Sequence, residues 1–453
     1  MRFEQLIDPD LGCASYIVGD AGAAIVVDPG LDCERHLAAA RRLGLEIRHV
    51  VETHVHADHV SGRALLAAAT GARLHAPAAA GIAGADPLAD GDELAVGDVR
   101  LRALATPGHR PEHTAYAVAD VSRSAAPWLL LSGDSLLVGD VARPDLAIDA
   151  RDGARALHAS LRRLLALGDH VELWPGHVGG SLCGGSQLSR KTSSTLGYER
   201  RTNPLLAIES VADFSAAALA QLPLRPPTVE RVVARNRGAS PSGAAAAAPL
   251  LTPADAAPLL AQGAVLLDAR TAVAFDAAHV PGSLSLPLTG EGLGTRAAWA
   301  LDGDAPLLVL AELEADAREL ARRLRAVGLD RIAGVLAGGS AAWRAAGLAL
   351  ESAGTLSLAA LRARLGELTL VDVRARDEWD AGHVAGAVFL PAERLRDGAA
   401  ELVRRAPLVV GCAAGNRAAF AASFLRRAGA ERVLRLGGGI PELPAHGVEL
   451  VRG

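Results

Sequence analysis

The stretch Thr53-His54-Val55-His56-Ala57-Asp58-His59 decides how the first half of the chain is interpreted. It places three histidines and an aspartate within six residues. The apolar pair Val50-Val51 before it predicts the end of a strand, and the run from Arg63 to Ala69 after it predicts a helix. Imidazole and carboxylate groups crowded on one strand-to-helix loop are typical of side chains that share a cation. The stretch therefore predicts a metal site.

Other candidate ligands follow other predicted strands. His109, Asp134 and His177 come shortly after the apolar runs 99–105, 129–133 and 173–175. A side chain at the C-terminal end of a strand is held in place by the rigid sheet, which suits a metal ligand. A lone histidine after a strand would mean little, but coordinated placements of this kind favour a metal centre.

Together with Val27-Asp28-Pro29-Gly30, this set of side chains resembles the metallo-β-lactamase superfamily. The set consists of His54, His56, Asp58, His59, His109, Asp134 and His177. The resemblance covers about residues 1–237 and implies an αββα sandwich with the metal at one edge of the two sheets. It leaves the reaction open, because the superfamily includes hydrolases, nucleases and oxidoreductases.

Composition limits the classes of protein that need to be considered. A chain of 453 residues is too long for one core, so about three domains are expected. Half of the residues are hydrophobic and the net charge is -5, which favours neither nucleic acid nor an anionic membrane as a partner. There is no signal-peptide pattern, no membrane-spanning run and no disulfide framework among four cysteines, so we expect a cytoplasmic protein. Alternating strands and helices indicate the α/β class.

Two further residues of the first half are candidates for the site. Residues 139–146 look like the segment that persulfide dioxygenases of this superfamily place beside the active site. The resemblance implies that Arg143 helps to hold the carboxylate of a thiol cofactor; a solvated loop arginine is the alternative. Cys183 lies in a polar stretch rich in serine and glycine, and is either a substrate-side thiol or an inert cysteine.

Residues 238–249, rich in glycine, serine and alanine, predict a linker, and the chain beyond it repeats itself. Asp268-Ala269-Arg270 returns as Asp372-Val373-Arg374, and His279-Val280 returns as His383-Val384, both at an offset of 104. The match indicates a duplicated domain of roughly 100 residues. We expect the two copies at 250–350 and 355–453. Their shared pattern resembles the rhodanese family, an α/β fold with a central parallel sheet.

The second copy contains a loop that suits sulfur chemistry. Cys412 to Arg417 follow an apolar run at 408–411 and precede a predicted helix. The pattern Cys-x-x-Gly-x-Arg resembles the rhodanese active loop. Backbone amides, the helix N-terminus and Arg417 would stabilise a thiolate at Cys412, which could then carry a sulfane sulfur as a persulfide. The alternative is a purely structural cysteine.

The first copy lacks these features. Aligning Pro306 with Pro407 places Ala311 opposite Cys412. The loop 311–316 then has no thiol and contains three carboxylates, which would repel a thiolate and its anionic substrates. We therefore predict that this copy has no sulfurtransferase activity and acts as a spacer or docking surface.

The whole chain is similar to fused persulfide dioxygenase–sulfurtransferases. This resemblance implies one Fe(II) per chain, held by His54, His109 and Asp134. Two histidines and one carboxylate leave positions for water, O2 and the persulfide sulfur. The family oxidises a thiol persulfide with O2 to sulfite, and its rhodanese domain joins sulfite to another sulfane sulfur to give thiosulfate, or runs the reverse transfer. Such chemistry serves sulfide detoxification.

A second interpretation uses the remaining histidines differently. Superfamily hydrolases bind two zinc ions, one through His54, His56 and His109 and the other through Asp58, His59 and His177, with Asp134 as the bridge. The chain could therefore be a dinuclear zinc thioester hydrolase of glyoxalase II type. In an iron enzyme, His56, Asp58, His59 and His177 would instead support the ligands or handle protons.

A third interpretation, a sulfur-carrier or scaffold protein that docks partners through the rhodanese pair, leaves the complete ligand set unexplained. For an enzyme, the expected partners are small molecules: a persulfide of glutathione, coenzyme A or another low-molecular-weight thiol, O2, and sulfite or thiosulfate. Related dioxygenases commonly self-associate, so the resemblance also implies a homo-oligomer.

Overall fold

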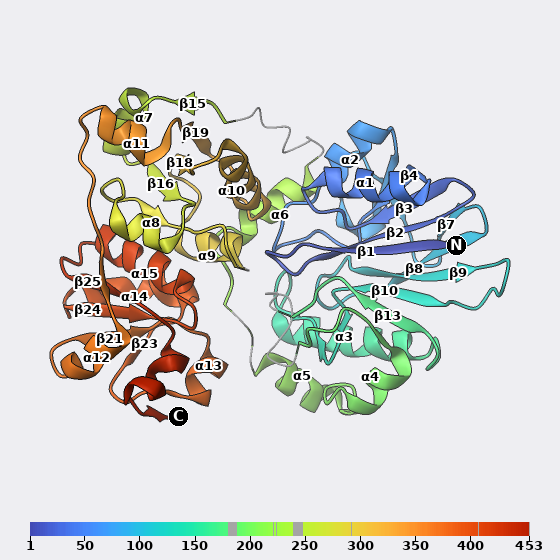
Figure 1. The fold of residues 1–453 in the computed structure, drawn as a ribbon. Coiled ribbons are helices and arrows are strands. Elements are labelled where there is room, and N and C mark those ends of the chain that lie inside the picture. Colours follow the sequence, from blue (N-terminus) through green and yellow to red (C-terminus); the bar gives the residue numbers. More distant parts are fainter. Residues whose placement is uncertain are drawn as a thin grey trace. The chain divides into compact units, whose positions relative to one another are not determined.

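The computed structural model describes residues 1–179, 188–220, 222, 224–238, 248–290, 292–405 and 407–452. Cys183 and most of the predicted linker lie outside the described residues. The chain forms two compact units (Figure 1). The N-terminal unit is mainly Met1–Arg225 with Val229–Ala245, and the C-terminal unit is mainly Ala246–Arg325 with Leu329–Gly453. Among the described residues we find no helix with the length and apolar character that crossing a bilayer requires.

The N-terminal unit contains two six-stranded sheets. The first has its strands in chain order: β1 (Arg2–Ile7), β2 (Ala14–Asp20), β3 (Ala23–Val27), β4 (Glu46–Val51), β5 (Arg73–Pro77) and β6 (Asp86–Leu88). The second has the order β14 (Ser194–Thr195), β13 (Glu172–Pro175), β10 (Leu129–Gly133), β9 (Thr114–Asp120), β8 (Val99–Ala105) and β7 (Glu93–Val96). A short ribbon pairs β11 (Leu136–Leu137) with β12 (Asp140–Val141).

Helices cover the outer faces of both sheets (Figure 1). They are α1 (Cys33–Leu43) and α2 (Arg63–Thr70) on the first sheet, and α3 (Ala150–Leu165), α4 (Leu196–Thr202) and α5 (Val211–Leu219) on the second; α6 (Val229–Arg237) and η1 (Ala78–Ala80) complete the unit. Side chains alternate along β2: Tyr16 packs between the two sheets, whereas Ile17 packs under the helices. The predicted αββα sandwich is confirmed.

The strand pairing brings the predicted ligands to one edge of the second sheet. β10 and β13 are parallel, and Gly133 pairs with Pro175, so Asp134 and His177 leave the sheet side by side. Gly133 has a φ of 49°, and a Cβ there would lie 2.6 Å from His113 Nε2. A side chain at this position would therefore displace the imidazole that contacts Asp134.

A histidine in α1 should make the stability of this unit depend on pH. His36 is buried; its Nδ1 donates to Asp32 O at 3.1 Å and its Nε2 lies 2.8 Å from Ser15 Oγ. Burial lowers the pKa of His36 to about 4. In the unfolded chain the pKa of a histidine side chain is about 6.5, so the unfolded state takes up a proton at a higher pH than the folded state does. The free energy of unfolding therefore decreases as the pH falls from about 6.5 towards 4.

We expect the opening free energy of α1 to fall by about 2 kcal/mol between pH 7 and pH 5 because of this residue. Amide hydrogen exchange of α1, corrected for intrinsic rates, measures it. His36→Gln should remove that part of the pH dependence, and replacement of the exposed His170 should not. An unchanged pH profile in His36→Gln would refute the assignment.

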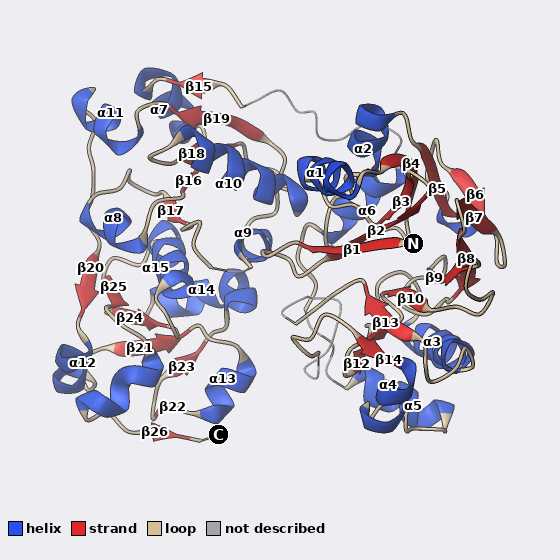
Figure 2. Cartoon of the chain, turned by 45° about the vertical axis from the view of Figure 1, so that its right-hand side comes forward, coloured by secondary structure: helices blue, strands red, loops and turns tan. Residues whose placement is uncertain are grey.

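The C-terminal unit contains two all-parallel five-stranded sheets of the same topology (Figure 2). The first has the order β15 (Leu250–Leu251), β19 (Ile332–Leu336), β18 (Leu307–Leu310), β16 (Val265–Asp268) and β17 (Leu284–Ser285). The second has the order β20 (Gly354–Leu356), β25 (Val433–Leu436), β24 (Leu408–Gly411), β21 (Thr369–Asp372) and β23 (Val388–Phe389). The duplication deduced from the sequence is thus present in the fold.

The remaining elements surround these sheets. In the first copy they are α7 (Pro253–Ala261), α8 (Ala272–Ala277), α9 (Leu293–Ala300), α10 (Glu314–Ala326) and α11 (Gly339–Ala345). In the second they are α12 (Leu358–Arg364), α13 (Arg376–Ala381), η2 (Ala392–Arg394), α14 (Leu395–Val403), α15 (Asn416–Arg427), η3 (Ile440–His446) and the pair β22 (His383–Val384) with β26 (Leu450–Val451).

The repeated Asp-x-Arg motif forms a buried ion pair in both copies. Arg270 Nη2 lies 2.6 Å from Asp268 Oδ2, and Arg374 Nη2 lies 2.6 Å from Asp372 Oδ2. Each guanidinium also donates to a backbone carbonyl eight residues on, at 2.8 and 2.7 Å. Removal of one partner would leave a buried charge uncompensated, which explains why both halves of the motif recur.

The two copies also pack against each other. Asp276 of the first copy pairs with the buried Arg435 of the second at 2.7 Å, and Ser285 N donates to Ser423 Oγ at 3.0 Å. The first copy is therefore a packing partner of the second. A role in docking other proteins stays a prediction, as do the exact domain limits.

Candidate functional site

Three of the predicted ligands converge on one point. His54 follows β4, His109 follows β8 and Asp134 follows β10. His54 Nε2 lies 3.8 Å and His109 Nε2 lies 3.4 Å from Asp134 Oδ2, and all three side chains are at most 1% exposed. In the described chain none of these three atoms has a hydrogen-bond partner. Buried polar atoms seldom stay unsatisfied, so their convergence fits a bound cation.

Both imidazoles are held so that Nε2 faces this point. Thr53 Oγ1 donates to Asp28 Oδ2 at 2.7 Å and thereby accepts from His54 Nδ1 at 2.8 Å. His109 Nδ1 donates to the backbone carbonyl of Arg143 at 2.9 Å. Because the proton of each ring is used at Nδ1, each Nε2 keeps its lone pair for a metal.

We expect Thr53→Val to weaken metal binding by about 10- to 100-fold, because the valine cannot accept from His54 Nδ1 and the ring loses its fixed tautomer. Competition with a metal-binding dye on the full-length protein measures the affinity. Thr53→Ser keeps the hydroxyl and should retain near-normal affinity. Equal affinities of the serine and valine variants would show that the hydroxyl does not orient His54.

Asp134 is held on both sides by histidines. Its Oδ1 accepts from His177 Nδ1 at 2.7 Å, and its backbone N–H donates to His113 Nε2 at 2.9 Å. Burial would raise the pKa of Asp134, but the neighbouring imidazole of His177 holds it below its usual range. Burial lowers the pKa of His113 to about 3, so this ring stays neutral. His113 was not among the predicted residues; its position four residues after His109 was the available signal.

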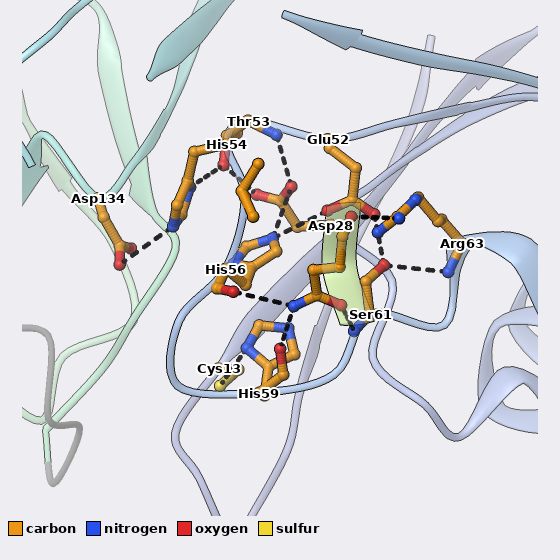
Figure 3. Close-up of polar contacts among 12 residues, drawn as sticks. Cys13, Asp28, Glu52, Thr53, His54, His56, His59, Ser61, Arg63 and Asp134 are labelled. Carbon is orange, nitrogen blue, oxygen red and sulfur yellow. Dashed lines mark hydrogen bonds and ion pairs between the residues drawn. The ribbon is translucent and has the colours of Figure 1, made fainter. Parts of the chain in front are cut away.

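His56 does not join the convergent group. Its Nε2 lies 3.2 Å from Asp28 Oδ1 and 3.0 Å from Glu52 Oε2 (Figure 3). Burial alone would lower the pKa of His56, but these two carboxylates raise it well above its ordinary value. These contacts direct His56 Nε2 at the two carboxylates, in a group apart from His54, His109 and Asp134. Glu52, the residue directly before the quoted stretch, is therefore a determinant of the site that the sequence analysis did not name.

The other predicted residues form a separate group. Asp58, His59 and His177 lie together, and Cys13 joins them at the start of β2. The loop that carries Asp58 and His59 is fixed by Asn236 of α6, whose Nδ2 donates to His56 O at 2.9 Å and to His59 O at 2.7 Å. The loop's shape is thus set by a residue far away in the sequence.

Arg143 lies next to the candidate metal ligand His109, and its side chain forms an ion pair of its own. Its Nε and Nη2 donate to the two carboxylate oxygens of Asp145 at 2.7 and 2.9 Å. The side chain is 4% exposed, so a solvated loop arginine is excluded. Asp145 also pairs with Arg225 at 3.0 Å, which leaves this cluster with two cations and one carboxylate.

In the second rhodanese copy, backbone amides surround the cysteine as predicted. Cys412 is buried directly after β24, and the N–H groups of Gly415 and Ala418 lie 3.0 and 3.4 Å from its Sγ. Arg417, expected to help to stabilise the thiolate, makes a bidentate contact with Glu378 at 2.5 and 2.8 Å, and the charge of Cys412 contributes to a raised pKa of its guanidinium. The two amides and the N-terminus of α15 lie directly at the sulfur.

In the first copy, the loop that corresponds to the Cys412 loop lines a cavity of about 260 Å³. Its lining includes Arg270, Thr289, Ala311, Glu312 and Asp316. Ala311 follows β18 as Cys412 follows β24, which supports the alignment made from the sequence. The cavity contains carboxylates but no thiol, as predicted.

Comparison with known families agrees with this architecture. Residues 8–177 match the metallo-beta-lactamase superfamily, and residues 252–346 and 357–445 each match the rhodanese-like domain. The chain is therefore a metallo-beta-lactamase-fold protein fused to two rhodanese-like domains.

Individual relatives point to more than one activity. A hydroxyacylglutathione hydrolase of Polaromonas sp. is 39% identical over 36% of this chain and 61% of its own length. The human mitochondrial persulfide dioxygenase ETHE1 is 27% identical over 45% of this chain and 75% of its own. The fold also resembles the crystal structure of a metallo-beta-lactamase from Staphylococcus aureus, with 27% sequence identity and a TM-score of 0.66. The matched region covers 74% of this chain and 98% of the Staphylococcus aureus chain. The chain spans about three fifths of the hydroxyacylglutathione hydrolases that it matches.

Proposed function

We propose that the N-terminal unit is an Fe(II) persulfide dioxygenase, which oxidises low-molecular-weight thiol persulfides with O2 to sulfite, and that Cys412 performs a coupled sulfur transfer. The observation that carries the proposal is that His54, His109 and Asp134 converge on one point. His56 lies outside this group and contacts two carboxylates instead. Two imidazoles and one carboxylate with further positions open are the ligand set of non-haem iron oxygenases. The similarity to persulfide dioxygenases supports the same assignment.

The residues around the ligands would then have separate tasks. Bound Fe(II) supplies the redox chemistry at which O2 and the persulfide sulfur react. Thr53 and the Arg143 carbonyl orient the two imidazoles, and His177 orients Asp134. Burial of all three ligands keeps bulk water from the reacting sulfur.

For the thiol part of the substrate we propose the cluster of Arg143, Asp145 and Arg225. Two guanidinium groups share one carboxylate there, so a substrate carboxylate can pair with the excess positive charge. Arg225 is the partner more open to solvent, with 42% of its side chain exposed. This extends the expected role of Arg143 to a pair of arginines.

The sulfur transfer at Cys412 balances without an added oxidant. The thiolate attacks the outer sulfur of a persulfide RS–SH, a new S–S bond forms at Cys412, the old one breaks and RS⁻ leaves. Sulfite then attacks that outer sulfur, which releases thiosulfate, a proton and the Cys412 thiolate. The N–H groups of Gly415 and Ala418 stabilise the anionic sulfur at the start and end of this cycle.

Oxygen uptake by full-length Fe(II)-loaded protein tests the proposal. Glutathione and coenzyme A persulfides are offered in turn, and sulfite and thiosulfate are quantified. Uptake with matching formation of sulfur oxyanions is expected. Absence of uptake with every low-molecular-weight persulfide, in protein shown to contain iron, overturns the dioxygenase.

The second candidate is a dinuclear zinc hydrolase of 2-hydroxyacylglutathione thioesters. The higher identity to hydroxyacylglutathione hydrolases favours it. The contacts of His56 with Asp28 and Glu52 speak against it, because this imidazole would be needed as a ligand of the first zinc. Thioester hydrolysis by zinc-loaded protein, without oxygen uptake by the iron form, would establish this alternative.

A further inference from the structure

A cavity between the two rhodanese copies has no role in the reactions proposed above. Its volume is about 450 Å³, the size of a small-molecule site. In this part of the C-terminal unit, α15 of the second copy packs against β17 of the first (Figure 2). The lining includes His279 and Ser283 of the first copy, Glu351 of the segment between the copies, and Ser423, Arg426 and Arg427 of α15. Both copies therefore contribute polar side chains to one cavity.

Two guanidinium groups supply the positive charge of this cavity. Arg426 Nη2 donates to Val433 O at 2.7 Å, and Arg427 Nη1 donates to Gly282 O at 2.8 Å. Both acceptors are neutral carbonyls outside α15, and in the described part of the chain neither arginine forms an ion pair with a carboxylate. Burial lowers the pKa of both arginines. Each guanidinium is thus held in place by one contact and keeps its charge and further N–H groups for an anion.

The other polar side chains of the lining offer hydrogen-bond acceptors. His279 Nδ1 donates to Phe275 O at 2.9 Å and burial lowers the pKa of His279, so the neutral ring keeps a lone pair at Nε2. The hydroxyls of Ser283 and Ser423 donate to backbone carbonyls at 2.7 and 2.8 Å, which uses their single hydrogens. The carboxylate of Glu351 only accepts. A ligand that satisfies this lining must therefore be an anion that brings at least one hydrogen of its own.

The backbone fixes the place of two of these acceptors. His279 and Glu351 pair in an antiparallel bridge, in which His279 N donates to Glu351 O at 2.8 Å and Glu351 N donates to His279 O at 2.9 Å. The ring of His279 also stacks on Phe275, with centroids 4.0 Å apart. The acceptors are therefore part of the folded framework of the first copy.

We propose that this cavity binds a phosphate group that retains a proton, either as inorganic phosphate or as a small phosphate monoester, and that the ligand bridges the two copies. Two guanidinium groups and one carboxylate leave the lining with a net positive charge. The guanidinium fork matches the oxygens of a phosphate. Near neutral pH inorganic phosphate keeps at least one hydrogen for the acceptors, whereas sulfate and thiosulfate keep none. Binding involves no covalent step, and the site does not rest on the reactions proposed for the iron centre or for Cys412.

Calorimetric titration of the full-length protein with inorganic phosphate, in a buffer without other oxyanions, tests the site. We expect one saturable site per chain and an affinity at least about tenfold higher for phosphate than for sulfate, because sulfate leaves the acceptors without a hydrogen. Glycerol 3-phosphate is the monoester probe. Tighter binding than that of inorganic phosphate supports the site with a monoester as its ligand, and weaker binding supports it with inorganic phosphate.

Arg427→Gln should weaken phosphate binding by at least about tenfold, because the amide can still donate to Gly282 O but carries no charge. Arg404→Gln is the matched control, since Arg404 is an exposed arginine at the C-terminal end of α14 in the same copy. That variant should bind phosphate as the unmodified protein does. Absence of saturable phosphate binding, or equal affinities of the Arg427→Gln and Arg404→Gln variants, overturns the proposal.

Glu351→Gln tests whether the acceptors select the hydrogen of the ligand. The glutamine removes a negative charge and offers an N–H donor, so sulfate should bind more tightly and the preference for phosphate should fall to within about threefold. A simple electrostatic site would gain affinity for both anions by the same factor. An unchanged ratio of phosphate to sulfate affinity in Glu351→Gln would therefore overturn the assignment of a protonated phosphate.

Discussion

Asp134→Asn should lose its iron and its oxygen uptake together. Asp134 Oδ2 is directed at the point where His54 and His109 converge, and Oδ1 accepts from His177. An asparagine has one oxygen for these two tasks, so either the metal loses its anionic ligand or an amide N–H is placed against His177 Nδ1. We expect iron affinity to fall by more than about 100-fold, since loss of a ligand exceeds the effect of losing an outer partner.

Iron content after gel filtration, followed by oxygen uptake with glutathione and coenzyme A persulfides, measures the effect. Asp152→Asn is the matched control, because Asp152 is an exposed carboxylate on α3 that pairs with Arg155. Transfer of sulfur from thiosulfate to cyanide should be unchanged in both variants. Normal iron content in Asp134→Asn would exclude the assigned ligand set.

Cys412→Ser should have the opposite pattern. A serine hydroxyl is a far weaker nucleophile and cannot store a sulfane sulfur, so sulfur transfer to cyanide should fall by on the order of 10³-fold or more. Oxygen uptake should persist and the product should shift from thiosulfate towards sulfite. Thiocyanate formation and the ratio of the two oxyanions are the measurements.

The first rhodanese copy supplies a control for this variant. Ala311→Cys should not restore transfer in the Cys412→Ser background, because Glu312 and Asp316 line the cavity and no glycine follows at the place of Gly415. Residual transfer in Cys412→Ser that is equal to that of the unmodified protein would identify another cysteine as the sulfur carrier.

The sequence was sufficient for the fold because its signals were local and strong. The strand before His54, the helix after the histidine stretch and the repeat at an offset of 104 residues are all present in the structure. The helix predicted from Arg63 to Ala69, for example, is α2 (Arg63–Thr70), and Gly71 ends it with a left-handed φ of 72°. Periodicity and capping are properties of neighbouring residues, so they can be recognised in one chain.

The division of the histidine stretch into separate groups could not be predicted in this way. His54, His56 and His59 are neighbours in sequence, yet they face Asp134, Asp28 with Glu52, and Cys13 respectively. Except for Glu52, these partners are distant in the sequence, and only the folded sheets bring them together. The same applies to Arg417, whose partner Glu378 belongs to another helix.

The Asp-x-Arg pairs of the two rhodanese copies bear on how such a chain evolves. Asp268 and Arg270 persist in a copy that has no active-site cysteine. The parts of the domain that selection for stability maintains are therefore distinct from those that selection for catalysis maintains. After a duplication, the loop behind the fourth strand can drift while the sheet remains folded. The first copy is thus a stable recipient into which a new six-residue loop, and with it a new anion specificity, could be introduced.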